Sequence, residues 1–134
     1  MIYRLNIKTH APAEFQDITD RVNDAISKSG VEEGICLVFV PHTTAGITIN
    51  EHADPDVAED IIARLEAMVP KQAGYKHGEG NSAAHIKASM IGSSVTAIVQ
   101  YGELALGTWQ GIFFCEFDGP RNREVHIKVI SDRE

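Results

Sequence analysis

Two histidines with a glutamate between them lie in one short polar stretch, YKHGEGNSAAHIKAS (residues 75–89). Imidazole is the commonest metal ligand in proteins and exchanges a proton near neutral pH. His77 and Glu79 lie among glycines, and His85 falls in the first turn of a predicted helix. A loop that folds back on the helix would bring these groups together in a set that suits zinc or a similar metal. The alternative is a helix-start histidine bonded to loop backbone, because the spacing matches no compact metal motif.

A third histidine follows a strand that we expect to be buried. His42 is succeeded by Thr43 and Thr44, so an imidazole and two hydroxyls are expected where that strand ends. Functional groups are commonly presented to a cleft in this way. Three protein ligands with one open position are the usual arrangement of catalytic zinc, which makes His42, His77 and His85 a candidate metal set. A solvated turn is the alternative for His42.

The same polar stretch is also suited to binding an anion. Gly80, Asn81 and Ser82 lead into a predicted helix, where unpaired backbone N–H groups and the helix dipole favour a phosphate. Lys87 and Arg121 are cations that would reach such a ligand. The alternative is a flexible loop whose glycines serve only the backbone, and for Lys87 an ordinary structural role.

Glu51 is the candidate general base outside this stretch. It follows the predicted strand AGITIN (45–50) and forms a polar cluster with His52 and Asp54. Asp54 is expected to cap a helix that begins at Pro55, and His52 is expected to be exposed. A surface carboxylate is the alternative interpretation of Glu51.

Trp109 and His126 are given structural interpretations. The indole of Trp109 is expected in the core, and the flanking Gly107 and Gly111 suggest that backbone or ligand comes close there. His126 alternates with apolar neighbours on a predicted strand and is expected to face solvent or another subunit.

The elements that must position these residues predict an α+β fold, an antiparallel β-sheet or sandwich with about three short helices. A period of two over residues 3–8 predicts a strand, and residues 19–29 predict a helix that Gly30 ends. The later predictions are a continuous apolar strand at 34–40, a strand at 45–50, a helix from Pro55 with a buried stripe from Val57 to Met68, and a helix N-capped by Ser82 and ended by Gly92. They end with strands at 94–100 and 124–130 and, between these, a long strand at 104–117 that is broken by Gly107 and Gly111.

Length and composition predict one domain, residues 1–134, in a soluble cytoplasmic protein. The formal net charge of −7 argues against a nucleic-acid partner, which needs a basic surface. No apolar stretch is long enough to cross a membrane. Cys36 and Cys115 lie in apolar runs, so we expect buried thiols in a reducing compartment.

Three segments together resemble the YjbQ family of small proteins over nearly the whole chain. They are VPHTTAGITINE (40–51) with DPDV (54–57), HGEGNSAAHIKASMIG (77–92), and LALGTWQGIFFCEFDGPR (104–121). The resemblance implies an α+β homotrimer with a histidine-lined site that holds a metal or an anion. His42, His77 and His85 fall on the recurrent histidine positions of the family, and Glu51, Asn81, Lys87 and Ser89 on polar ones. The acidic position after His77 varies within the family, which leaves open whether Glu79 is a ligand.

Members of the family are described as secondary thiamine-phosphate synthases. The resemblance implies that a hydroxymethylpyrimidine diphosphate is joined to a thiazole phosphate with release of pyrophosphate, as a weak or side activity. The implied cofactor is a divalent metal, either zinc or the magnesium or manganese that accompanies a diphosphate. Glu51, His85 and Lys87 are the catalytic candidates, and the candidates for binding phosphate are Thr43, Thr44, Gly80, Asn81, Ser82 and Arg121. The alternatives are a metal-dependent hydrolase of a small phosphorylated metabolite and a non-catalytic metabolite- or metal-binding trimer.

Overall fold

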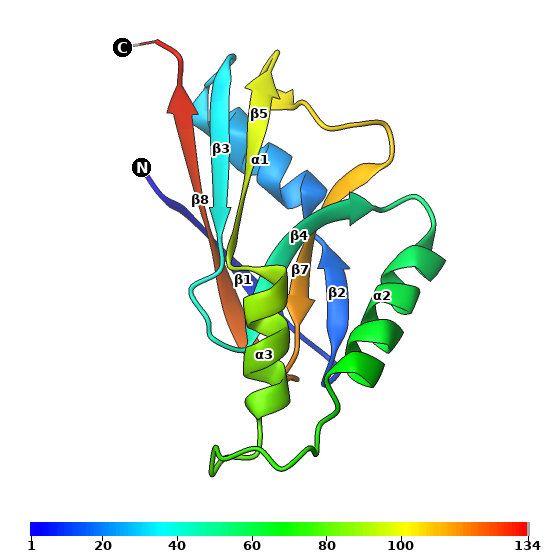
Figure 1. Cartoon of the computed structure of the whole chain (residues 1–134). Coiled ribbons are helices and arrows are strands. Elements are labelled where there is room, and N and C mark those ends of the chain that lie inside the picture. Colours follow the sequence, from blue (N-terminus) through cyan, green and yellow to red (C-terminus); the bar gives the residue numbers. More distant parts are fainter. Residues whose placement is uncertain (134) are drawn as a thin grey trace.

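The computed structural model describes residues 1–133 of the chain (Figure 1). Within these residues it contains three helices and two antiparallel sheets, which confirms the predicted α+β class. The helices are α1 (Thr19–Ser29), α2 (Pro55–Met68) and α3 (Ser82–Ile91). The strands are β1 (Tyr3–Lys8), β2 (Glu14–Asp17), β3 (Gly34–Phe39), β4 (Ala45–Glu51), β5 (Ser94–Gln100), β6 (Glu103–Leu104), β7 (Gln110–Glu116) and β8 (Asn122–Ser131).

The two sheets share one hydrophobic core. The large sheet has the strand order β1-β8-β3-β5-β6, and the small sheet has the order β2-β7-β4. Helix α1 packs against β6, β7 and β8, and its apolar face contributes Val22, Ala25 and Ile26 to the core. Helix α3 lies beside β4 and helix α2 beside β2, so both helices flank the small sheet (Figure 1).

Strand β3 departs from its prediction as a continuously buried strand. Its side chains alternate, with Cys36 and Val38 buried and Ile35 and Phe39 exposed. Ile35 pairs with Ile98 on one side and with Ile130 on the other, so the outer face of the large sheet carries a row of exposed isoleucines. A sheet with one face on the core and one open face explains the pattern.

Two helices differ from the prediction at their ends and faces. Asp54 caps α2 as expected, because its side chain accepts a hydrogen bond from the Asp56 backbone. Met68, however, is 60% exposed and does not belong to a buried stripe. Asn81, not Ser82, is the N-cap residue of α3. That helix buries three alanines, Ala83, Ala84 and Ala88, whose short side chains allow it to lie close to β4. It also buries Lys87, whose Nζ pairs with Glu66 of α2.

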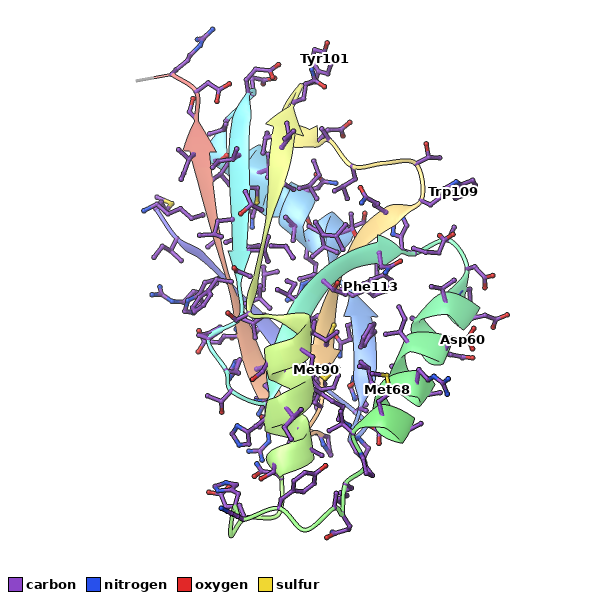
Figure 2. The ribbon with its side chains drawn as sticks, in the orientation of Figure 1. Asp60, Met68, Met90, Tyr101, Trp109 and Phe113 are labelled. Atoms are coloured by element: carbon purple, nitrogen blue, oxygen red, sulfur yellow. The ribbon has the colours of Figure 1, made fainter. Side chains whose placement is uncertain are left out.

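The region after Gln100 agrees with its prediction only in part. The predicted break at Gly107 is confirmed, because β6 and β7 are separated by a turn in which the Gln110 side chain accepts a hydrogen bond from the Gly107 backbone. The predicted break at Gly111 is wrong, because Gly111 lies inside β7. Trp109 lies in this turn and is 63% exposed, so its assignment to the core is wrong (Figure 2). Strand β2 was not predicted, because its sequence, EFQD, has little β-propensity apart from Phe15.

Both cysteines are free and buried, as expected. Burial raises the pKa of the Cys36 thiol to about 11 and raises the pKa of Cys115 further. Among residues 1–133 there is no helix with both the length and the apolar character needed to cross a membrane.

Candidate functional site

The three predicted histidines lie along one polar cleft made of two adjoining hollows. His42, Thr43 and His85 line both hollows. The first hollow, about 450 Å³, has a charged lining that includes Glu79 and Arg121. Its other lining residues are Pro41, Thr44, His77, Asn81, Asp118 and Arg123. The second, about 490 Å³, is lined by small residues: Ala45, Ala88, Ser89, Gly92 and Ser93. Such volumes suit a small metabolite.

Three chain segments build the charged hollow. The loop after β3 supplies His42, the loop before α3 supplies His77, and the turn between β7 and β8 supplies Arg121. Antiparallel pairing of β8 with β3 holds the loop after β3 against the turn between β7 and β8. The packing of α3 beside β4 brings the loop before α3 to the same place. Residues far apart in sequence therefore meet at one end of the molecule.

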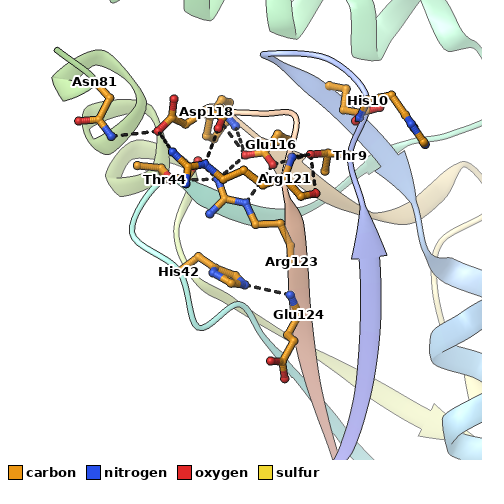
Figure 3. A network of polar contacts seen from close by, with 12 residues as sticks. Thr9, His10, His42, Thr44, Asn81, Glu116, Asp118, Arg121, Arg123 and Glu124 are labelled. Atoms are coloured by element: carbon orange, nitrogen blue, oxygen red, sulfur yellow. Dashed lines mark hydrogen bonds and ion pairs between the residues drawn. The ribbon is translucent and has the colours of Figure 1, made fainter. Parts of the chain in front are cut away.

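His42 is held by the backbone of the neighbouring strand. The Glu124 N–H donates a hydrogen bond to His42 Nε2 at 2.9 Å (Figure 3). Burial, together with the nearby positive charge of Arg123, lowers the pKa of His42. The neutral ring therefore carries its proton on Nδ1, so Nδ1 is a hydrogen-bond donor.

His77 and His85 lie close enough to act together. Their ring centroids are 5.5 Å apart and their planes nearly perpendicular. His77 is exposed on its loop, whereas His85 is partly buried on α3. The two rings are close enough for one anionic ligand to contact both.

The arrangement does not fit the predicted set of three histidine ligands within one chain. Both nitrogens of neutral His42 are occupied, Nε2 by the Glu124 N–H and Nδ1 by its own proton. Across residues 1–133, no group of three or more His, Cys, Asp or Glu side chains is placed to hold a metal ion. His77 and His85 remain as two ligands of a site that would need further donors, so metal binding stays a prediction.

Arg123 is the most firmly positioned cation at the cleft. Its guanidinium pairs with the fully buried Glu116, through Nε at 2.9 Å to Oε1 and through Nη2 to Oε2 (Figure 3). Nη2 also donates to Thr44 Oγ1 at 2.8 Å. Thr9 Oγ1 donates to Glu116 Oε1 at 2.7 Å and so orients the carboxylate from the other side. Burial alone would raise the pKa of Glu116, but the hydrogen bonds from Arg123, Thr9 and the Asp118 backbone together lower it.

One amino group of Arg123 remains available to a ligand. Nη1 makes no hydrogen bond within residues 1–133. Asn81 Oδ1 is the one buried side-chain nitrogen or oxygen without a partner in this part of the chain. Nη1 is therefore not among the buried unpaired atoms, although Arg123 as a whole is only 6% exposed. Nη1 therefore keeps some contact with solvent, and Arg123 is one of the residues that line the charged hollow.

Arg121 and Asn81 meet at Asp118 beside the same hollow. Arg121 Nη2 and Asn81 Nδ2 each donate to Asp118 Oδ2 at 2.9 Å. Arg121 is half exposed, so it can turn toward a ligand at small cost.

Several predicted site residues lie elsewhere. Lys87 is buried away from the histidines, with Nζ 2.5 Å from Glu66 Oε1 and over the ring of Phe117, and it lines a neighbouring hollow together with Gly80. Ser82 lies in the first turn of α3 and lines neither hollow of the cleft. Glu51 accepts a hydrogen bond from the Ala53 backbone after β4 and is likewise absent from the cleft lining.

Sequence reasoning missed four residues: Thr9, Glu116, Asp118 and Arg123. A signal for Glu116 was present in the sequence, because a lone carboxylate inside the apolar run GIFFCEF must have a buried partner. The basic residues that follow in PRNR were the available partners. Which of them turns inward depends on the register of β8.

The chain matches known proteins over almost its full length. A family model described as UPF0047 protein YjbQ-like matches residues 3–132. A UPF0047 protein of Methanocaldococcus jannaschii is 54% identical over 133 residues, 99% of this chain and 96% of that protein. The UPF0047 protein YugU of Bacillus subtilis is 50% identical over 131 residues, which are 97% of this chain and 99% of that protein. A crystal structure of a yjbq/upf0047 family protein from Clostridium acetobutylicum superimposes with a TM-score of 0.94 at 56% identity, covering 96% of this chain and 99% of that one.

Proposed function

Because the chain belongs to the YjbQ/UPF0047 family, we propose that its cleft binds the phosphate groups of a small phosphorylated metabolite and transfers the organic part. The specific reaction proposed is the one that the family resemblance implies. It joins hydroxymethylpyrimidine diphosphate to thiazole phosphate and is a weak or side activity.

The observation that carries the proposal is the free Nη1 of Arg123. A guanidinium fixed by a buried carboxylate is a pre-organised donor, which loses little conformational freedom when an anion binds. His42 Nδ1 offers a second fixed donor, and His77 and His85 add charge when they are protonated. Arg121 supplies a mobile cation. These groups suit the oxygens of a phosphate or diphosphate.

The chemistry asks mainly for stabilisation of the leaving group. The thiazole nitrogen attacks the methylene carbon of the pyrimidine, a C–N bond forms, and the C–O bond to diphosphate breaks. Diphosphate leaves with the bonding electron pair, so its negative charge grows in the transition state. Donors already aimed at that position favour the reaction. His85, at the junction of the two hollows, is the proposed proton donor to the departing oxygen.

Two accompanying proposals concern metal and assembly. Magnesium or manganese would arrive with the diphosphate and supply further positive charge, while a zinc site would need donors beyond His77 and His85. We also propose the homotrimer that the resemblance implies. Its support is the open face of the large sheet, where Ile98 is 64% exposed, Ile130 46% and Ile35 41%.

The test combines binding with product analysis. Pyrophosphate affinity is measured by calorimetry, and pyrophosphate release from the two substrates is followed together with the coupled product. We expect His85→Ala to lower transfer by at least about tenfold. His10→Gln, an exposed histidine outside the cleft, should leave transfer unchanged. Equal binding and transfer by wild type and His85→Ala would refute the assignment. Release of phosphate without acceptor would indicate a hydrolase, and binding without turnover a non-catalytic protein.

A further inference from the structure

A separate hollow of about 400 Å³ is lined by residues of β2, β7 and α2 and of the segments that adjoin them. It shares no lining residue with the histidine cleft. Most of its wall is apolar: Ala13, Phe15, Pro55, Ala58, Ile62 and Phe113, the last of which Figure 2 shows on β7. The polar groups are His52 and the carboxylates of Glu14, Asp17, Asp54 and Glu59.

His52 is locked in one orientation at the edge of this hollow. Its backbone N–H donates to the Trp109 carbonyl at 2.9 Å, and its Nδ1 lies 2.8 Å from Asp17 Oδ2. The ring is packed so closely on Gly111 that a Cβ at that position would lie 2.3 Å from Nδ1. Only a glycine at position 111 leaves room for the ring. The sequence analysis expected such a close approach at the glycines beside Trp109, and at Gly111 the approaching group is the His52 ring.

The partner of His52 defines which ring nitrogen is available. Thr19 donates to Asp17 Oδ1 from both its hydroxyl and its backbone N–H. Burial alone would raise the pKa of Asp17, but these hydrogen bonds and the one with His52 lower it. An ionised Asp17 accepts the Nδ1 proton, so Nε2 of the neutral ring is a free acceptor. Nε2 makes no hydrogen bond with any residue from 1 to 133.

The charge of the lining has one sign. Four carboxylates line the hollow, and the lining includes no lysine or arginine. Asp54 caps α2, and Asp17 pairs with His52. Glu59, in contrast, is exposed and forms a hydrogen bond with neither the α2 backbone nor His52. Apolar walls with charges of one sign concentrate the electric field in the hollow. A bare metal ion would gain nothing from the apolar wall, whereas an organic cation would use both features.

We propose that this hollow binds a small organic cation, an apolar ring carrying an amine or amidinium group. The ring packs between Phe15, Ile62 and Phe113, and an N–H of the ligand donates to His52 Nε2. The positive charge lies near the rim carboxylate of Glu59. This would be a second ligand site, independent of the phosphate chemistry of the histidine cleft.

Three probes of the same shape test the proposal: benzamidine (cationic), benzamide (neutral) and benzoate (anionic). Binding is followed by NMR, on the ring resonances of His52, Phe15 and Phe113. We expect benzamidine to bind with a dissociation constant of about 1–10 mM. Benzamide should bind at least about fivefold more weakly, and benzoate should produce no shift. Pyrophosphate should leave these resonances unchanged, which separates this site from the cleft.

Two neighbouring residues on α2 give a matched pair of variants. Glu59→Gln removes a rim charge and should weaken benzamidine binding about two- to fivefold. Asp60→Asn removes the same charge one position along the helix, from a residue that does not line the hollow (Figure 2), and should have no effect. His52→Phe fills the same space without the acceptor and should weaken binding as well. The proposal is overturned if benzamidine shifts none of the three resonances at about 10 mM, if benzoate binds as well, or if Asp60→Asn weakens binding as much as Glu59→Gln.

Discussion

The ion pair beneath the cleft makes the sharpest prediction about stability. Glu116 is fully buried and accepts five hydrogen bonds: from Thr9 Oγ1, Arg123 Nε and Nη2, and the backbone N–H groups of Phe117 and Asp118. In Glu116→Gln one oxygen becomes an NH₂ group, which cannot accept a hydrogen bond, and the charge of Arg123 loses its partner. Removing one member of a buried pair costs about 3–5 kcal/mol.

Urea unfolding at pH 7 measures this loss. With an m-value of about 2 kcal/mol/M, the midpoint should fall by about 1.5–2.5 M. The double variant Glu116→Leu, Arg123→Met replaces both charges by apolar groups. It should be more stable than Glu116→Leu alone, because no buried charge is left unpaired. A Glu116→Gln midpoint within about 0.5 M of wild type would refute the claim that the pair is structurally essential.

The same pair predicts a dependence of stability on pH. The folded-state pKa of Glu116 lies below its ordinary value of 4.5. The stability that it contributes is therefore fully present above pH 4.5 and is lost as the pH falls through the folded-state pKa. Glu116→Gln should lack this part of the acid destabilisation. An unchanged pH profile in the variant would show that other carboxyls cause the effect.

Three further predictions test individual positions. The His42 imidazole should titrate below 6.5 in an NMR pH series, with the Nδ1–H tautomer in the neutral form, and a midpoint above 6.5 would contradict the burial argument. Lys87→Met should change the free energy of unfolding by no more than about 1 kcal/mol, because Glu66 is half exposed and can be hydrated, and pyrophosphate affinity should stay the same. A loss of pyrophosphate affinity in this variant would instead show that Lys87 contributes to phosphate binding. Gly111→Ala should cost about 1–3 kcal/mol in urea unfolding and move the His52 ring resonances, because the new Cβ collides with the imidazole, and an unperturbed His52 would refute the packing.

The sequence alone determined most of the local structure. Periodicity placed α1, β5 and β8, and the pair Asp54-Pro55 placed the start of α2 correctly. These signals are local, since capping and alternation depend on residues a few positions apart. The three histidines His42, His77 and His85 line one hollow, as the sequence suggested, while their role as ligands stays a prediction. The resemblance to the family agrees with the match over residues 3–132.

The tertiary structure decided which charges serve the cleft. Lys87 and Arg121 were both candidate cations in the sequence, with an ordinary structural role as the alternative for Lys87. The structure pairs Lys87 with Glu66, and Lys87 lines neither hollow of the cleft. Arg123 was missed, because its inward orientation depends on the pairing of β8 with β3 and β1. A shift of one residue in that register would turn it to the other face of the sheet.

The same distinction explains the hollow beside His52. The sequence showed a histidine next to acidic residues and glycines near a tryptophan. Only the pairing of β7 with both β2 and β4 brings Asp17, Gly111 and His52 together. Local chemistry therefore determined which side chains were available, and long-range strand pairing determined their partners, because those contacts join residues distant in sequence.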